Sequence, residues 1–570
     1  MYLWWIRLGG AEGLSAVGHR PGVPGLALVL GGTLGRSEVE ALAALEIALG
    51  PALGLAAGAL VRGRAGRAAW LLAGGLAGAF AVHLAAGYLA NLALAVLFLA
   101  ATAALAEGTR RGAVAAAALL AAGGLAHPLF FLLAAAILAL TAFLSLRSPE
   151  RSARDDAVRI GAALAGGGVA AGLGFAALLA GPDPPAVDTS RDAFLRRAGL
   201  HGVLRGAYLD RFVRRWARYV QWASVPLAVV GLFATGGFVR RFLLSWGVVV
   251  VAGVALSVGT GWAPADRSIT FGFVVPILAA LGLVRLWGAL EPRRPLALAA
   301  TGALTLAMLA GAFFAWNRQE PFLSELELAR LEAANRVVAA TEPGTAIVVW
   351  VNEGEGPGTF LATRAGNLVR AAVPPARIRD VVVFVPSRTA EADPATQADP
   401  DLLAERSALA RLSRRDVALA VARSDGARID LLIAPFDRID LPAAQRERRW
   451  ARAADGVFVQ PGVAPTGHAA DPLEASTPGA IAIAGLLAFA FLSASGFGWA
   501  RAATADALDA AALAPSIGAA TTILAAVLLD LLGARLDGGA GPIVASAAPG
   551  VGGYLAWLVL QRRARARSAP

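Results

Sequence analysis

The sequence predicts a polytopic α-helical membrane protein of about 13 transmembrane helices, with an extracytoplasmic α/β domain inserted before the last three helices. Hydrophobic residues make up 57% of the 570 residues, charged residues make up 16%, and the mean hydropathy is +0.62. Soluble domains typically contain about 25% charged residues. The other two observations are the recurrence of apolar runs near membrane-spanning length and one long polar stretch late in the chain.

The apolar runs fall into two blocks. Residues 1–38 are expected to form an outer loop and a juxtamembrane helix, 39–316 a transmembrane domain, and 477–560 the last transmembrane helices. A basic cytoplasmic tail, 561–570, ends the chain. The expected spans are 40–61, two within 68–106, two within 113–146, 160–180, 220–238, 242–260, 270–286, 295–316, 478–499, 514–533 and 542–560.

Arginine-rich loops predict the orientation of these spans. When "RGRAGR" is placed in the cytoplasm and sides alternate, "EGTRRG", "RSPERSARDDAVR", "EPRR" and the basic tail also fall inside. Short cytoplasmic loops are enriched in Lys and Arg. We therefore expect a multi-pass plasma-membrane protein with a cytoplasmic C-terminus and with residues 181–219 and 317–476 outside the cytoplasm.

The polar stretch 317–476 is expected to fold as an α/β domain. "PFLSELELARLEAANRVVAAT" has apolar residues at helical spacing, and near-continuous apolar runs occur at 345–351, 380–386 and 429–436. Short runs of this kind are typical of buried parallel strands. The Gly-rich "NEGEGPG" that follows the first run lacks the lysine of a P-loop, so a flexible loop is favoured over a phosphate site.

Composition also excludes several kinds of chemistry. The chain has no cysteine, which excludes disulfides, thiolate metal sites and cysteine nucleophiles. Its five histidines form no spaced metal motif, so no zinc site and no cofactor are expected, and nothing in the composition indicates a divalent metal. The net charge of +11 is divided among short loops, as in cytoplasmic loops of membrane proteins, so nucleic acid is not an expected partner.

A few ionisable residues lie within or beside the expected spans. Glu46 lies about two turns into the first span, where an ionisable group is costly and is a functional candidate by default. His127, Asp266 and Arg267 lie at outer ends of later spans, and the turn "GHRPG" contributes His19 and Arg20. Guanidinium groups match phosphate oxygens in a fork. These five residues therefore form a candidate lipid-phosphate site, with interfacial polar or snorkelling residues as the alternative.

The stretch "GHRPGVPGLALVLGGTLGRSEVEALAALEIALGPALGLAAGALVRGR" resembles the C-type (GT-C fold) polytopic glycosyltransferases, and "GLAHPLFFLLAAAILAL" and "ADRSITFGFVVPILAALGLVRL" are similar to later spans of that family. The resemblance covers about 1–316. It implies inverting transfer of a sugar from a polyprenyl-phosphate carrier to an extracytoplasmic glycan, lipid or protein acceptor. It also implies a catalytic acid in the first outer loop. That loop offers Glu12, with Glu38 and Glu40 after the proline turn, and the candidate acids are Glu12 and, within the first span, Glu46. Because the usual acid is absent from this loop, the chain as given is expected to lack full activity if no acid is supplied from upstream.

In that family an acidic pair commonly precedes a stretch similar to "MYLWWIRLGG". We therefore expect Met1 to be an internal methionine, with a further span and the acids encoded upstream. Tyr2, Trp4 and Trp5 are expected at the lipid–water boundary. Two other functions stay open at this point: a transporter or flippase for a lipid-linked or anionic substrate, and a non-catalytic membrane scaffold with a partner-binding outer domain.

Overall fold

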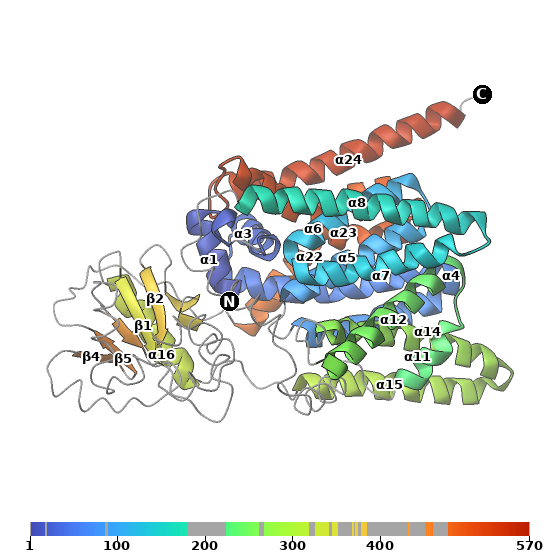
Figure 1. Cartoon of the computed structure of the whole chain (residues 1–570), viewed down its shortest axis with the longest axis horizontal. Coiled ribbons are helices and arrows are strands. Elements are labelled where there is room, and N and C mark those ends of the chain that lie inside the picture. Colours follow the sequence, from blue (N-terminus) through green and yellow to red (C-terminus); the bar gives the residue numbers. More distant parts are fainter. Residues whose placement is uncertain are drawn as a thin grey trace. The chain divides into compact units, whose positions relative to one another are not determined.

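A computed structural model describes a large set of helices and five strands. The described residues are 2–17, 20–85, 89–179, 224–260, 267–317, 325–340, 345–350, 368–369, 371–373, 378–384, 431–433, 451–454, 456–459 and 477–568. They fall into two compact units. Residues 2–12 and 325–459 belong to a sheet unit, and residues 13–179, 224–317 and 477–568 belong to a helical unit (Figure 1).

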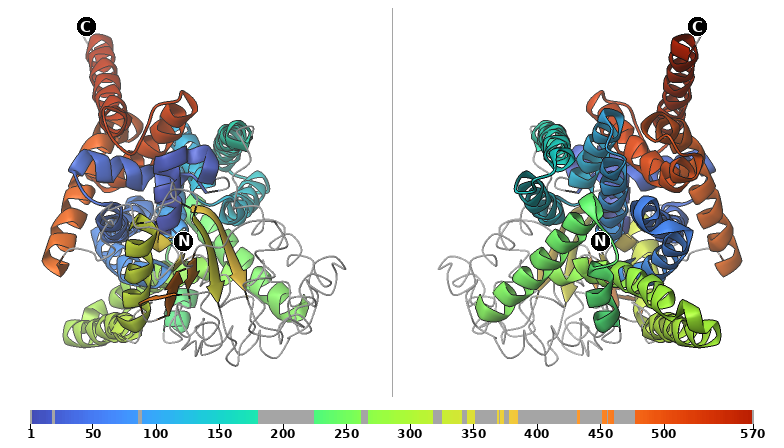
Figure 2. Two further views of the ribbon diagram at one scale, coloured as in Figure 1. Left: turned by 90° about the vertical axis from the view of Figure 1, so that its left-hand side faces the viewer. Right: turned by 90° about the vertical axis from the view of Figure 1, so that its right-hand side faces the viewer.

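The helical unit is a bundle of long apolar helices whose ends lie side by side in the end-on views of Figure 2. Its elements are α2 (Leu14–Val17), α3 (Gly22–Leu34), α4 (Glu38–Ala85), α5 (Leu89–Ala106), α6 (Arg110–Ala126), α7 (Pro128–Leu146), α8 (Arg151–Leu179), α11 (Ser224–Leu232), α12 (Gly237–Thr260), η1 (Arg267–Phe273), α14 (Val274–Leu290), η2 (Glu291–Arg293), α15 (Arg294–Asn317), α22 (Pro478–Ala503), α23 (Ala507–Leu531) and α24 (Gly541–Ser568).

Nine helical stretches in the described part of the chain are long and apolar enough to cross a membrane. The chain is therefore a helical, multi-pass membrane protein. One of the nine, Ser268–Phe313, contains two of the spans expected from the sequence. The count of 13 stays a prediction, since part of the chain lies outside the described residues.

Helix α4 is a hairpin rather than one rod. Gly66 has non-helical backbone angles, φ 83° and ψ −177°, and divides α4 into a first arm (38–63) and a second arm (67–85). A Cβ atom added to Gly54 would lie 2.5 Å from the carbonyl oxygen of Gly74, and one added to Gly58 would lie 2.9 Å from that of Trp70. Small residues at such spacing let membrane helices approach backbone to backbone.

The last three helices are part of the bundle and not an appendage to it. Helices α22 and α23 pack against each other and against α4, and α23 also contacts α3 and α6. The backbones approach closely where Gly496 meets Ala514 and where Gly518 meets Leu492. Residues 477–560, a separate segment in the sequence prediction, therefore belong to the same compact unit as the preceding helices.

Helix α3 lies across one end of the bundle. Gly22 packs against Ala126 at the end of α6, Gly25 packs beside Ala526 near the end of α23, and Gly32 packs against Pro542 at the start of α24. In Figure 1, α3 is seen nearly end-on while α5, α7 and α8 run across the view. Residues 22–31 are all buried. The sequence predicted a juxtamembrane helix here, and the structure gives a helix that protein covers, while its position relative to the membrane stays a prediction.

Contacts between loops define the opposite end of the bundle. Arg62 donates to Asp506 at 2.5 and 3.0 Å and to Asp509 at 2.8 Å. Arg241 donates to Asp156 at 2.8 Å and to Ser145 at 2.9 Å. These residues flank loops that the arginine pattern places together on one side. The contacts agree with the predicted alternation of the spans, and the side of the membrane that each end faces stays a prediction.

The sheet unit contains a five-stranded mixed sheet in the order β2-β1-β3-β5-β4. Its strands are β1 (Thr345–Trp350), β2 (Ile378–Phe384), β3 (Leu431–Ile433), β4 (Ala451–Ala454) and β5 (Val457–Val459), and α16 (Glu325–Ala340) contacts β4 and β5. Strands β1, β2 and β3 lie in the three apolar runs of the sequence prediction and pair in parallel. Strands β4 and β5 form an antiparallel pair that their short sequence did not reveal.

The N-terminal helix α1 (Tyr2–Glu12) belongs to the sheet unit. Arg7 is buried, and its Nη1 donates to the carbonyl oxygens of Ala371 and Ala372 at 3.0 and 3.2 Å. Trp4 and Trp5 are 7% and 3% exposed. The prediction that these two rings lie at the lipid–water boundary is therefore wrong, because the protein itself buries them.

Candidate functional site

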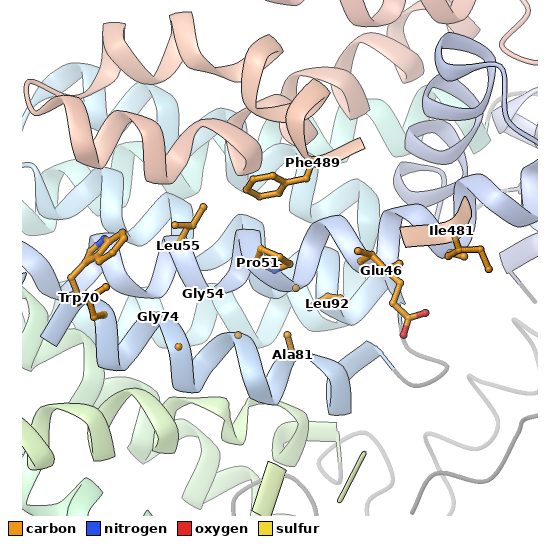
Figure 3. Close-up of a pocket in the computed structure, with 16 residues that line it drawn as sticks. Glu46, Pro51, Gly54, Leu55, Trp70, Gly74, Ala81, Leu92, Ile481 and Phe489 are labelled. Atoms are coloured by element: carbon orange, nitrogen blue, oxygen red, sulfur yellow. The ribbon is translucent and has the colours of Figure 1, made fainter. Parts of the chain in front are cut away.

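A groove of about 980 Å³ runs between the two arms of α4 and is completed by α5 and α22 (Figure 3). Leu71 on its wall is 63% exposed, so the groove opens to the surface of the helical unit. It is lined by Ala43, Glu46, Ile47, Gly50, Pro51, Gly54, Leu55, Trp70, Leu71, Gly74, Gly75, Gly78, Ala81, Leu92, Ile481 and Phe489. Its volume is typical of pockets that bind small molecules.

Helical periodicity explains the first wall of the groove. Residues three and four apart in a helix share one face. Ala43, Glu46, Gly50 and Gly54 follow that spacing on the first arm of α4, and Gly54 lies against Gly74 of the second arm. Pro51 lies within the same arm, where its ring contributes to the wall.

Glu46 is the one charged residue among the described residues that line the groove. Its side chain is exposed, and no described residue donates a hydrogen bond to its carboxylate or forms an ion pair with it. Figure 3 places Glu46 and Ile481 toward one end of the groove and Trp70 toward the other. A carboxylate inside a candidate membrane span is costly, and one that no described residue pairs with marks a functional position.

Glu12, the other candidate acid, is exposed at the last position of α1. It belongs to the sheet unit, whereas the groove lies wholly in the helical unit. Glu40 has a local role, because it forms a capping box with Ser37 at the start of α4, with distances of 3.3 and 3.4 Å. Among these acids, the groove singles out Glu46.

His127 has a structural role that the sequence prediction missed. It is 4% exposed at the junction of α6 and α7, and its Nδ1 accepts a hydrogen bond from the backbone N–H of Phe130 at 3.3 Å. The imidazole also stacks on the Phe130 ring, with centroids 4.3 Å apart. His127 therefore caps the N-terminus of α7, and its contact with a lipid phosphate stays a prediction.

The other four candidate lipid-phosphate residues are only partly placed. His19 and Asp266 lie outside the described residues, and so does the side chain of Arg267, which begins η1; Arg20 is half-buried. Their chain segments nevertheless converge. Gly22 packs on Ala126, and the ring of Phe130 lies 5.6 Å from that of Phe271 in η1. Arg20, His127 and Arg267 thus belong to backbone segments that lie near one another at the α3 end of the bundle.

A charged cluster at the other end of the bundle was not foreseen from the sequence. We call Arg62, Glu107, Asp506 and Asp509 the Arg62 cluster. Hydrogen bonds from Arg62 hold the pKa of the Asp506 carboxyl well below its usual range. Burial, and then repulsion from Asp509 and Asp506, raises the pKa of Glu107. No linear spacing signals the cluster, since hundreds of residues separate Asp506 and Asp509 from Arg62 and Glu107.

The described residues contain no group of three or more histidine, aspartate and glutamate side chains placed to hold a metal ion. No protein-family model matches the chain, and no curated protein shows significant sequence similarity to it. The groove and its carboxylate therefore have to be interpreted from their own chemistry.

Proposed function

We propose that the protein is a membrane glycosyltransferase that moves a sugar from a polyprenyl-phosphate carrier to an acceptor outside the cytoplasm. The observation that carries the proposal is the Glu46 carboxylate, which has no partner among the described residues and lies in an apolar groove within candidate membrane spans. A carboxylate in such a place is suited to take a proton from a hydroxyl group that a lipid or glycan presents at the membrane.

The reaction would proceed by direct displacement. The acceptor hydroxyl oxygen attacks C1 of the sugar, the bond from C1 to the phosphate oxygen breaks, and its electron pair leaves on the lipid phosphate. The hydroxyl proton passes to the Glu46 carboxylate. Arg20 and Arg267, whose segments meet at the α3 end of the bundle, are the groups we expect to stabilise the departing phosphate.

The proposal includes an orientation. The α3 end of the bundle faces away from the cytoplasm, the Arg62 cluster faces the cytoplasm, and the sheet unit is an extracytoplasmic α/β domain. The arginine pattern of the sequence supports this orientation. It places Glu46 toward the face on which lipid-linked sugars would be used.

The first testable prediction concerns Glu46 directly. In nanodiscs supplied with a polyprenyl-phosphate sugar and an extract of membrane lipids, we expect Glu46→Gln to lower the rate of sugar transfer by about 10²–10⁴-fold, the range for loss of a general base. Glu291→Gln, an exposed carboxylate change in η2, is the matched control and should leave the rate unchanged.

Full transfer by the Glu46→Gln protein would show that this carboxylate is not the base. A transporter gives a different result. Wild-type protein would then move a fluorescent polyprenyl phosphate between the leaflets of a vesicle without releasing or transferring its sugar, and the glycosyltransferase proposal would be wrong.

A further inference from the structure

The negative charge of Glu46 decides whether the groove can hold the polyprenyl-phosphate donor or the acceptor. Resting on the function proposed above, we infer that the groove is the acceptor site and that the acceptor is a lipid with a neutral, hydroxyl-bearing headgroup. Its apolar chain lies between the arms of α4, and its hydroxyl reaches Glu46. The phosphate of the donor binds outside the groove.

Electrostatics argue against a phosphate in the groove. Its described lining contains no arginine, lysine or histidine to pair with an anion, and its single charge is the carboxylate of Glu46. Like charges repel strongly where the surroundings are apolar, because the effective dielectric constant is low. A hydroxyl group, in contrast, can donate a hydrogen bond to the carboxylate, which no described residue does.

The glycines of the groove are of two kinds, and the difference shows that its space is built into the fold. Gly54 and Gly74 are needed for contact between the arms, since a Cβ on either would meet the other's carbonyl oxygen at 2.5 and 3.0 Å. Gly75 has no atom within 4 Å of an added Cβ, and Gly78 has none closer than 3.8 Å. The missing side chains at these two positions keep the groove open and are not required by helix packing.

The position of the groove fits a lipid chain. Its walls come from the candidate spans Glu38–Gly63, Leu89–Ala106 and Pro478–Ala503, together with the second arm of α4. From Glu46 to Leu55 the first arm rises about 13 Å at 1.5 Å per residue. A chain entering beside Glu46 can therefore run along the apolar wall toward Trp70, which lies at the other end of the groove in Figure 3.

The test compares two photoreactive lipids with the same acyl chains, a diacylglycerol and the corresponding phosphatidic acid, on the full-length protein in nanodiscs. We expect the diacylglycerol to crosslink to residues 43–81 and 481–489 at least ten times more than phosphatidic acid does. Gly75→Leu fills the groove without meeting another atom at Cβ and should reduce this crosslinking at least tenfold. Gly302→Leu on α15, which also has open space at Cβ but lies outside the groove, is the control and should not.

Glu46→Gln removes the negative charge and preserves the size of the side chain. We therefore expect diacylglycerol and phosphatidic acid to crosslink to this variant equally, because both still enter the groove. Equal crosslinking of diacylglycerol and phosphatidic acid to the wild-type protein would overturn the inference, because the groove would then hold ordinary bilayer lipid regardless of its charge.

Sugar transfer distinguishes failure of this inference from failure of the proposed function. If wild-type protein transfers sugar and Gly75→Leu transfers it equally fast, the groove is not the acceptor site although the enzyme function stands. If the neutral lipid enters the groove selectively but no polyprenyl-phosphate sugar is ever consumed, the site stands as a lipid site and the glycosyltransferase proposal fails.

Discussion

Single residues show how strongly burial and partners decide the role of a polar side chain. Glu46 and His127 both lie beside apolar runs, and the sequence offered each as a candidate for function. His127 is 4% exposed and caps a helix, whereas Glu46 is exposed in a groove and has no described partner. An ionisable residue beside an apolar run thus proved to be a helix cap in one case and stays a candidate catalytic residue in the other.

Glu107 gives a residue-scale prediction in the Arg62 cluster. Its pKa is raised in the folded protein by burial and by Asp509 and Asp506, so the folded state favours the protonated form. The stability it contributes is fully present below about pH 4.3, the ordinary pKa of glutamate, and is lost as pH rises through its raised pKa. We expect Glu107→Gln to raise the unfolding midpoint at pH 7 by about 1–3 °C.

The difference between Glu107→Gln and wild type should shrink to nothing as the pH is lowered to 4, when both carry a neutral side chain at this position. Thermal unfolding in detergent, followed by tryptophan fluorescence, measures it. Exposed Glu291→Gln is again the control, with no change expected at either pH. A midpoint for Glu107→Gln below wild type at pH 7 would contradict the expected sign.

At the scale of elements, the α4 hairpin depends on glycine at specific contacts. A methyl group on Gly54 would lie 2.5 Å from the carbonyl oxygen of Gly74, so the two arms would have to separate. We expect Gly54→Ala to lower the free energy of unfolding by about 1–3 kcal/mol, the usual cost of overpacking. Gly75→Ala, on the opposite arm with open space at Cβ, should leave stability unchanged or raise it.

Unfolding of both variants in increasing sodium dodecyl sulfate would measure these differences. A stable Gly54→Ala protein would mean that the arms do not touch at this position. Because Gly54 and Gly75 both line the groove, the comparison isolates helix contact from loss of groove volume.

At the scale of the whole molecule, the two ends of the bundle should face opposite sides of the membrane. The chain has no cysteine, so labelling of a single introduced thiol shows which side of the membrane that residue faces. Ala505→Cys and Gly538→Cys lie in exposed loops at opposite ends of α23. We expect a membrane-impermeant maleimide to label Gly538→Cys in intact cells, and Ala505→Cys only after the membrane is opened. The reverse pattern would invert the proposed orientation.

Part of the site could be predicted and part could not. Glu46 could be singled out because an ionisable residue inside an apolar run is visible in the sequence alone. The groove around it could not, because Trp70 reaches it only through the turn at Gly66, and Phe489 reaches it from hundreds of residues away. The capping role and burial of His127 could not be predicted for a related reason, since the number of residues that bury a side chain is not a local property.

The sequence by itself determined that this is a helical, multi-pass membrane protein and that three apolar runs of the polar stretch form parallel strands. Length, hydropathy and charge are properties of contiguous residues, so they can be read along the chain. Only the tertiary structure decided that α22 and α23 pack into the bundle, that α3 is buried, and that glycines create a groove beside Glu46. These three features depend on which helices pack together. The sequence of one segment does not reveal which distant segment it will contact.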